Sequence, residues 1–368
     1  MFSRLRIYLS NFDWIIFAAV FLLVAFGLLE IYSVALGQGS FNLFNFQKQL
    51  LLAGIGFAGL FIFAFFDSYF LKSLNRYFYV LAVLLLLGVL VFGATIRGTR
   101  GWFAFAGFNL QPVEFVKIVL ILFLANFFSG LATKVKTIRH FLFSALGAGF
   151  LITLALLQPD FGSAMILSAI WLLMIIVAGF NKKYYLAVGM TVLVLLSFSW
   201  FFLFKDYQKE RVINFFNPGA NARESGYNIS QAIIAVGAGG LTGKGVGFGS
   251  QSQLKFLPEA QTDFIFAVIS EELGFLGVLL VLSFYAVFLF RCWRVLPEIK
   301  NDFGIYFIIG GAGLIFIQMF INIGMNLGIM PVVGLPLPFI SYGGSSLVSL
   351  LILVGIMENI IIKSKISF

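Results

Sequence analysis

The sequence is poor in charge and nearly devoid of cysteine and histidine. Charged residues make up 11% of its 368 residues, against about 25% in an average soluble domain, whereas 61% are hydrophobic and 18% are aromatic. The one cysteine, Cys292, excludes an intrachain disulfide, and the one histidine, His140, leaves no His/Cys cluster for zinc. A chain of this length with so few polar residues cannot cover its apolar surface in water. The composition therefore indicates an integral membrane protein.

The net charge of +9 does not indicate nucleic-acid binding. The basic residues fall in short segments between apolar stretches rather than along one polar face, which is typical of a membrane topology signal. Arg4 and Arg6 precede a first apolar stretch that ends near Ser33-Val34-Ala35, a pattern that resembles a signal peptide. That stretch is long for a signal core and many similar ones follow it, so we expect a retained first span.

Ten stretches are apolar and long enough to cross the hydrocarbon core as helices, which takes about 20 residues each. They are 13–35, 46–66, 77–96, 112–130, 141–158, 161–180, 184–204, 263–290, 304–326 and 340–362. Only Gln158-Pro159-Asp160-Phe161-Gly162 separates the fifth from the sixth, where proline and glycine predict a helix boundary. The sequence therefore predicts an all-α membrane protein, a single domain over residues 1–368, with one long polar loop at about 205–262 between the seventh and eighth helices.

An even number of spans places both termini on the same side of the membrane. The positive-inside rule makes that side the cytoplasm, because more than half of the 24 basic residues then lie inside. The loop at about 205–262 then lies on the outer face. Its glycine-rich part has neither the Walker A spacing nor the preceding strand of a dinucleotide site, so we expect a re-entrant turn there.

Charged side chains within spans are costly and therefore mark functional candidates. Two of them, Asp67 and Glu358, lie near cytoplasmic ends, where we expect contact with water. The others lie in the outer halves of the spans and are Glu30, Lys48, Glu114, Lys117, Asp160, Asp263, Glu271 and Glu272. This one-sided distribution predicts that any chemistry takes place at the outer face.

Three positions among these charges have two interpretations each. Asp263 directly precedes an apolar helix and faces the glycine-rich loop, so it is either a general base or a helix N-cap, a position that Thr262 can also fill. Asp160 follows a proline and either caps a helix or lines the site. Glu114 and Lys117 lie three residues apart on one helical face, as a structural ion pair or as direct substrate contacts.

An outer carboxylate among cations suits a reaction on a lipid-linked, phosphate-bearing sugar. A general base takes a hydroxyl proton, while cations stabilise a pyrophosphate leaving group. The available cations are Arg97, Arg100, Lys117, Arg211 and Lys244.

Four motifs occur in order along nearly the whole chain. They are QPVEFVK at 111–117, QPDFG at 158–162, LPEAQTDFIF at 257–266 followed by EELG at 271–274, and PVVGLPLPFISYGGS at 331–345. With the spans around them, they resemble the signatures of the SEDS family of bacterial cell-wall polymerases. The short termini and DYQKERV at 206–212 are most similar to the RodA branch, of cell elongation, with FtsW, of division, as the second choice.

This resemblance implies a peptidoglycan glycosyltransferase that polymerises lipid II on the outer face of the bacterial cytoplasmic membrane, together with a class B penicillin-binding protein. It implies that Asp263 deprotonates the 4-hydroxyl of the acceptor sugar. That oxygen then attacks the anomeric carbon of the lipid-linked donor strand and expels undecaprenyl pyrophosphate. The resemblance also implies that Glu114, Lys117 and Asp160 line or support a central cavity.

The chain departs from the family pattern near the expected site. One residue separates Arg100 from Trp102, which are adjacent in many relatives, and we expect both, with Lys244, at the cavity. Lys255 and Gln261 stand where relatives often carry glutamate and histidine. A divalent cation, Mg²⁺ or Mn²⁺, is associated with activity in the family, but no ligand set stands out in the sequence.

Two other functions stay open. A transporter, in particular a lipid II flippase, usually needs polar groups near the midplane of the membrane, and the one-sided charges argue against it. A scaffold that binds a synthase through its helices, without chemistry of its own, predicts that Asp263 is dispensable.

Overall fold

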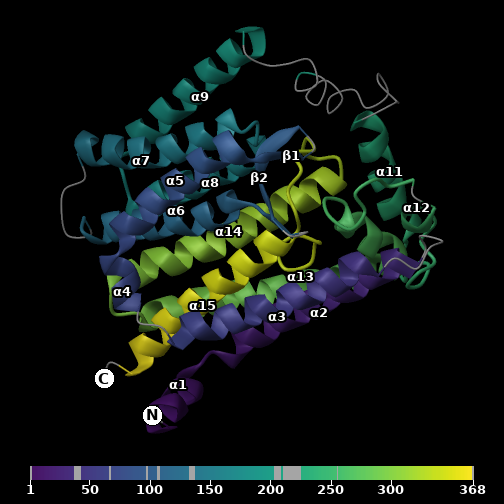
Figure 1. Ribbon diagram of the computed structural model, residues 1–368, viewed down its shortest axis with the longest axis horizontal. Coiled ribbons are helices and arrows are strands. Elements are labelled where there is room, and N and C mark those ends of the chain that lie inside the picture. The colour runs from purple at the N-terminus through teal and green to yellow at the C-terminus, as the bar shows by residue number, and fades with distance from the viewer. Residues whose placement is uncertain are drawn as a thin grey trace.

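The protein is a bundle of long helices that run along one common direction (Figure 1). The computed structural model describes residues 2–36, 43–65, 68–96, 98–105, 108–131, 137–202, 209, 225–254 and 256–366. The long helices are α2 (Trp14–Leu36), α3 (Phe44–Phe65), α5 (Asn75–Phe92), α6 (Pro112–Ser129), α7 (Ile138–Leu157), α8 (Phe161–Ala178), α9 (Lys182–Phe202), α13 (Ile265–Val295), α14 (Asp302–Asn326) and α15 (Gly344–Ile366). The shorter ones are α1 (Phe2–Asn11), α4 (Ser68–Ser73), α11 (Ser225–Ala238), α12 (Ser250–Gln253) and the 3-10 helix η1 (Leu296–Glu298).

The predicted spans coincide with these helices. Among the described residues, nine helices are long and apolar enough to cross a membrane: α2, α3, α5 to α8, and α13 to α15. The boundary between the fifth and sixth spans is confirmed, since α7 ends at Leu157 and α8 begins at Phe161. The predicted seventh span corresponds to α9, which is not among the nine, so the count of ten is not confirmed.

Both ends of the chain lie at one end of the bundle, with α11 and α12 at the opposite end (Figure 1). The described part of the long polar segment therefore lies at the opposite end of the bundle from the termini, and the side of the membrane that each end faces stays a prediction. We call the end with α11 and α12 the outer end.

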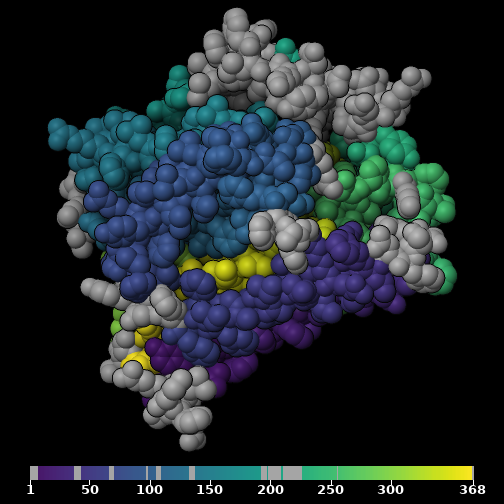
Figure 2. Space-filling view, viewed as in Figure 1, coloured from purple at the N-terminus to yellow at the C-terminus, as the bar shows by residue number. Residues whose placement is uncertain are grey.

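Helix α15 is the most enclosed of the candidate spans, with 83% of its apolar window buried. It packs against α3, α6 and α14. Figure 2 shows much of it as a narrow yellow strip between α3, in indigo, and the blue helices that follow α3 in the chain. Gly355 lets α15 approach α3 closely, because a Cβ there would lie 2.9 Å from the Leu60 Cα. The last helix of the chain thus fills the centre of the bundle.

The expectation of an all-α fold misses a small antiparallel sheet in the connection between α5 and α6. Its strands β1 (Ala94–Ile96), β2 (Thr99–Phe105) and β3 (Phe108–Leu110) lie in the order β1-β2-β3. Ala94 pairs with Trp102, and Phe103 pairs with Leu110. The strands are too short for their side-chain alternation to stand out between two apolar helices.

The segment expected as a loop at about 205–262 is partly helical and partly core. Ala232 and Ala235 of α11 are fully buried and belong to a cluster that includes Phe264 and Val268 at the start of α13. The small alanine side chains allow α11 to pack closely against α13. This contact joins the outer segment to the helix that follows Asp263.

Helix α13 is broken at Gly274, which has φ 64° and ψ −161°, a conformation open only to glycine. The break leaves backbone groups unpaired within the helix, and the loop at 240–245 pairs with them. The N–H groups of residues 244 and 245 donate to the carbonyls of 271 and 272 (3.0 and 2.8 Å), and those of 275 and 276 donate to the carbonyls of 240 and 241 (2.9 and 3.1 Å). The glycine-rich segment therefore turns back onto α13 and completes its interrupted hydrogen bonding.

At the opposite end, buried charges join the two ends of the chain. Arg291 pairs with Asp13 at 2.8 Å, and the Asp13 N–H donates to the Glu358 carboxylate at 3.0 Å. Glu358 is fully buried, so the expectation that it contacts water is wrong, because the start of α2 covers it. Asp67 lies outside the described residues.

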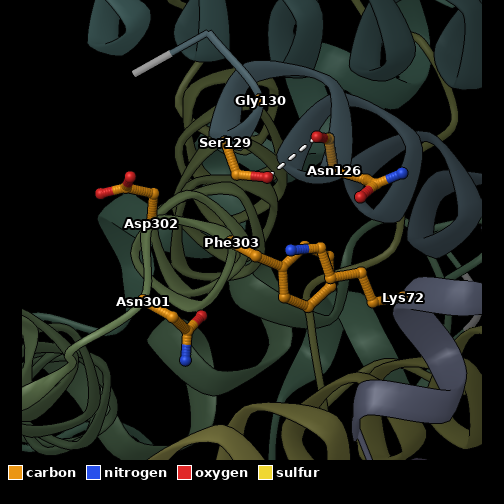
Figure 3. A pocket seen from close by; sticks show the side chains of 7 residues that line it. All are labelled: Lys72, Asn126, Ser129, Gly130, Asn301, Asp302 and Phe303. Atoms are coloured by element: carbon orange, nitrogen blue, oxygen red, sulfur yellow. Dashed lines mark hydrogen bonds between the residues drawn. The ribbon is translucent and has the colours of Figure 1, made fainter. Parts of the chain in front are cut away.

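A cavity of about 260 Å³ also opens at this end. Figure 3 shows its lining, which comes from α4, the end of α6 and the start of α14. The lining residues are Lys72, Asn126, Ser129, Gly130, Asn301, Asp302 and Phe303. Since Asp263 lies at the start of α13, at the outer end, this cavity is no part of the predicted site.

Candidate functional site

The turn that carries Asp263 is held through its main chain. The carbonyls of three consecutive residues each accept hydrogen bonds from α14 or from the segment at 331–343, which connects α14 to α15. The bonds run from Tyr342 N to Gln261 O (2.7 Å), from Ser341 Oγ to Thr262 O (2.6 Å), and from the side-chain amides of Asn322 and Asn326 to Asp263 O (3.0 Å each). Burial raises the pKa of the Tyr342 phenol above its usual value. The backbone at Asp263 is thus fixed from two sides.

Asp263 is not the cap of α13. The N-cap residue is Phe264, and within the described chain no side-chain cap bond forms there. The Thr262 hydroxyl donates instead to Glu259, at 3.0 Å from its carboxylate. The Asn326 side-chain oxygen accepts a hydrogen bond from the Ala267 N–H at 3.2 Å, so a residue of α14 pairs with the first turn of α13. Both capping interpretations from the sequence are therefore wrong, and the Asp263 side chain is half-buried beside the start of the helix.

The segment at 331–343 lies between Asp263 and the start of α8. A Cβ on Gly334, which has φ 71°, would lie 3.6 Å from Asp263 Oδ2. A Cβ on Gly162 would lie 2.8 Å from the Val333 carbonyl oxygen. Three of the four sequence motifs therefore meet here, on either side of one short stretch of backbone.

Asp160 caps α8, as one of its two interpretations predicted. Its Oδ1 accepts from the Ser163 N–H at 2.9 Å, and its Oδ2 accepts from the Ser163 hydroxyl at 2.8 Å. The Gln111 side-chain amide also donates to Oδ2, at 3.1 Å. Asp160 therefore fixes the start of α8 and joins it to the residue before α6.

Glu114 and Lys117 form the predicted ion pair in the first turns of α6. The Lys117 Nζ lies 2.7 Å from Glu114 Oε1, and the two side chains are 1% and 5% exposed. The other carboxylate oxygen, Glu114 Oε2, finds no hydrogen-bond partner among the described residues. A buried oxygen without a donor is costly and marks a place where water or a ligand can bind.

Arg100 and Trp102 lie on β2 at the outer end. The Arg100 guanidinium donates to the carbonyls of Gly93 (3.1 Å) and Val91 (2.8 Å), at the C-terminal end of α5. Trp102 is half-buried. Arg100 thus stabilises the end of a helix, whose partial negative charge favours a cation. The candidate cations Arg97 and Arg211 lie outside the described residues, as does Lys255.

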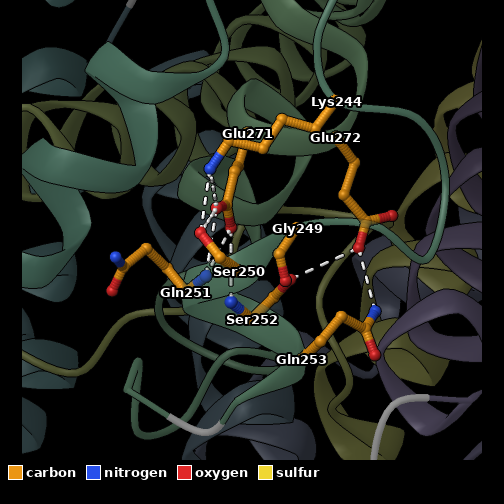
Figure 4. Close-up of polar contacts among 8 residues, drawn as sticks. All are labelled: Lys244, Gly249, Ser250, Gln251, Ser252, Gln253, Glu271 and Glu272. Atoms are coloured by element: carbon orange, nitrogen blue, oxygen red, sulfur yellow. Dashed lines mark hydrogen bonds and ion pairs between the residues drawn. The ribbon is translucent and has the colours of Figure 1, made fainter.

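Lys244 forms an ion pair with Glu271 across the loop that completes α13 (Figure 4). Its Nζ lies 2.8 Å from Glu271 Oε1, and the same carboxylate accepts from the N–H groups of Gln251 (3.0 Å) and Ser252 (3.3 Å). The neighbouring Glu272 is fully buried and accepts from the Gly247 N–H at 3.0 Å. The two glutamates thus hold the glycine-rich loop in place, with Lys244 as the partner of one of them.

The described residues do not fit a divalent-cation site. No group of three or more His, Cys, Asp or Glu side chains in this part of the chain is placed to hold a metal ion. Asp160 and Glu271, two carboxylates of the outer end, are each satisfied by protein donors.

Sequence reasoning missed the residues that hold the Asp263 turn, namely Asn322, Asn326 and Ser341. A signal for the first two was present, because Gln318, Asn322 and Asn326 repeat every four residues in an otherwise apolar helix. That spacing places three amides on one helical face, a costly arrangement unless they have partners.

The fold and these contacts define a multi-pass membrane protein with a network of polar contacts at its outer end. A family model described as FTSW_RODA_SPOVE, cell cycle protein, matches residues 13–366. The chain belongs to this family, as the four motifs predicted.

Curated relatives from several branches are similar to the chain. Stage V sporulation protein E of Bacillus subtilis is 36% identical over 95% of this chain and 96% of its own length. A probable peptidoglycan glycosyltransferase FtsW of Thiomicrospira cyclica is 36% identical over 98% and 94%. The peptidoglycan glycosyltransferase MrdB of Escherichia coli K12 is 37% identical over 77% and 76%. The similar identities leave the RodA branch a prediction.

Two solved structures share the fold. One chain, from a structure described as "Structural coordination of polymerization and crosslinking by a peptidoglycan synthase complex", has a TM-score of 0.81 and 30% identity, over 96% of this chain and 98% of that one. The rod shape-determining protein RodA of Thermus thermophilus has a TM-score of 0.72 and 29% identity, over 95% and 96%.

Proposed function

We propose that this protein is a peptidoglycan glycosyltransferase that polymerises lipid II into glycan strands on the outer face of the bacterial cytoplasmic membrane, with Asp263 as the general base. The observation that carries the proposal is the place of Asp263. It lies half-buried at the end opposite the termini, in a turn whose three carbonyls are held by neighbouring elements. Relatives named peptidoglycan glycosyltransferases support the reaction class.

The Asp263 carboxylate takes the proton of the acceptor sugar's 4-hydroxyl. The oxygen of that hydroxyl forms a bond to the anomeric carbon of the lipid-linked donor, and the bond from that carbon to the pyrophosphate breaks. Undecaprenyl pyrophosphate leaves with the bonding electron pair. A rigid turn suits this step, because general-base catalysis requires the carboxylate within hydrogen-bonding distance of the hydroxyl.

We assign two parts to the other candidate residues. The Glu114–Lys117 pair and Trp102 contribute to a cavity wall. The support is Glu114 Oε2, which has no hydrogen-bond partner in the part of the chain that the structure describes. Asp160, Arg100 and Lys244 have partners within the protein, and their part is to hold the outer end around that wall.

The membrane orientation and the partner also belong to this proposal. The termini face the cytoplasm, for which the positive-inside rule and the shared end of both termini are the support. The partner is a class B penicillin-binding protein, consistent with the similarity to a chain from a peptidoglycan synthase complex. A role in elongation, of the RodA type, rests on the sequence motifs alone.

The test compares purified wild type with Asp263→Asn and Glu259→Gln, using fluorescent lipid II, with and without the partner synthase. Glu259 is an exposed carboxylate in the same turn and serves as the matched control. We expect polymer from wild type and Glu259→Gln, and none from a well-folded Asp263→Asn. Equal polymer from all three would exclude Asp263 as the base, and translocation of lipid II without polymer would identify a flippase.

A further inference from the structure

Two asparagines of α14 make direct contacts with the main chain of the proposed base. Asn322 and Asn326 lie one helical turn apart and are both fully buried. Each side-chain amide donates a hydrogen bond to the Asp263 carbonyl oxygen, at 3.0 Å. One peptide carbonyl thus has two buried donors from the same helix face.

Each asparagine also holds a second element. The Asn322 amide donates to the Leu335 carbonyl at 2.7 Å, next to Gly334, the residue that faces the Asp263 carboxylate. Asn326 Oδ1 accepts from the Ala267 N–H at 3.2 Å, in the first turn of α13. Asn322 therefore fixes the distance between the Asp263 backbone and the segment at 331–343. Asn326 fixes the orientation of the Asp263 turn relative to the first turn of α13.

These bonds fix the direction in which the Asp263 side chain leaves the backbone. A carbonyl held by two donors fixes the plane of the peptide that follows Asp263, and with it the orientation of the Cα–Cβ bond. Both amides contact the backbone carbonyl of Asp263 and not its carboxylate, so they act on the orientation of the side chain through the main chain.

We propose that Asn322 and Asn326 are positioning residues for glycosyl transfer, which orient the Asp263 carboxylate toward the acceptor hydroxyl. This inference rests on the proposed function of Asp263. A general base displaced by about 1 Å loses up to about 100-fold in rate, while substrate binding through remote contacts is retained. The two asparagines therefore act on kcat far more than on KM.

The experiment measures lipid II polymerisation by Asn322→Asp and Asn326→Asp, which keep the side-chain shape but replace the donor amide with an acceptor. Gln318→Leu is the matched control, because Gln318 lies one turn deeper on the same helix, is fully buried and has no side-chain partner among the described residues. Unfolding temperatures of all variants are measured in the same detergent. If an aspartate variant does not fold, Asn322→Ala and Asn326→Ala, which remove the donor without adding a carboxylate, take its place.

We expect kcat to fall by about 10- to 100-fold in both asparagine variants, with KM within about threefold of wild type, and Gln318→Leu to stay near wild type. An unchanged kcat, an effect confined to KM, or an equal loss in Gln318→Leu would overturn the positioning role. Active wild type with fully active asparagine variants refutes this inference alone. Inactive wild type, or an active Asp263→Asn, refutes the proposed function instead.

Discussion

Replacing Gly274 with alanine is expected to destabilise the outer end of the protein strongly. Gly274 has φ 64° and ψ −161°, and a Cβ at this position would lie 2.7 Å from the carbonyl carbon and oxygen of Leu241. Backbone atoms cannot yield as a flexible side chain can, so the loop at 240–245 must move away. The four hydrogen bonds that complete α13 then weaken together.

The magnitude follows from these two effects. An alanine in a backbone region that only glycine populates costs about 1–3 kcal/mol. Each of the four loop-to-helix hydrogen bonds contributes about 0.5–1.5 kcal/mol. With partial loss of the four bonds, we expect Gly274→Ala to lower the free energy of unfolding by about 3–6 kcal/mol, which corresponds to a fall in unfolding temperature of about 5 °C or more.

The assay is thermal unfolding in detergent, followed by intrinsic tryptophan fluorescence. Gly54→Ala is the matched control, because Gly54 lies on an exposed face of α3 and a Cβ there meets no atom within 4 Å. We expect this control to be neutral or stabilised by up to about 1 kcal/mol, as alanine favours a helix. If both variants unfold at the same temperature, the loop does not depend on glycine at the break and our account of α13 is incorrect.

Two further predictions concern buried charges. Lys117→Met leaves the Glu114 carboxylate buried without its partner and should lower the free energy of unfolding by about 3–5 kcal/mol. The double variant Lys117→Met with Glu114→Gln should recover most of that loss. Additive effects of the two substitutions on stability would contradict the ion pair. Glu30 is fully buried in α2, and neither of its carboxylate oxygens has a partner among the described residues, so Glu30→Leu should raise stability by about 1–3 kcal/mol. A lower unfolding temperature for Glu30→Leu would show that this carboxyl makes a favourable contact in the folded protein.

The helices were predictable because the apolar residues that identify each span lie next to one another in the sequence. A run of about 20 apolar residues needs no partner to be identified as a span, and Pro112, Asp160 and Gly179 mark the boundaries of their helices chemically. The short sheet at 94–110 gives no comparable signal. Its strands are identified by their pairing with each other, and the sequence of one segment does not show with which other segment it pairs.

The candidate site was predictable only in part, for a related reason. The charges at Asp160, Asp263, Glu114 and Lys117 stand out against an apolar sequence, so the positions were found. Their partners were harder, because those contacts join distant segments. Lys244 could not be assigned to Glu271, 27 residues away, from sequence alone.

The same limit applies at the start of α13, where the capping alternatives for Asp263 and Thr262 are wrong. A carboxylate beside a helix start usually caps it, but here the buried amide of Asn326, 59 residues from Ala267, supplies the bond. A capping prediction from neighbouring residues fails where a side chain distant in the sequence accepts the hydrogen bond from the first turn of the helix. The regular spacing of the amides at 318, 322 and 326 can be read from the sequence, but the segment that they contact cannot.

The central position of α15 has a consequence for how the protein is made. Helix α15, the most enclosed of the candidate spans, and the 331–343 segment that holds the Asp263 turn both follow α14 in the chain. During synthesis, α3 therefore enters the membrane before α15, its main neighbour, has been made, and the surface of α3 that packs against α15 is not yet covered. A ribosome that stops before Gly344 leaves a protein with most of its spans in place but without the central helix that brings them together.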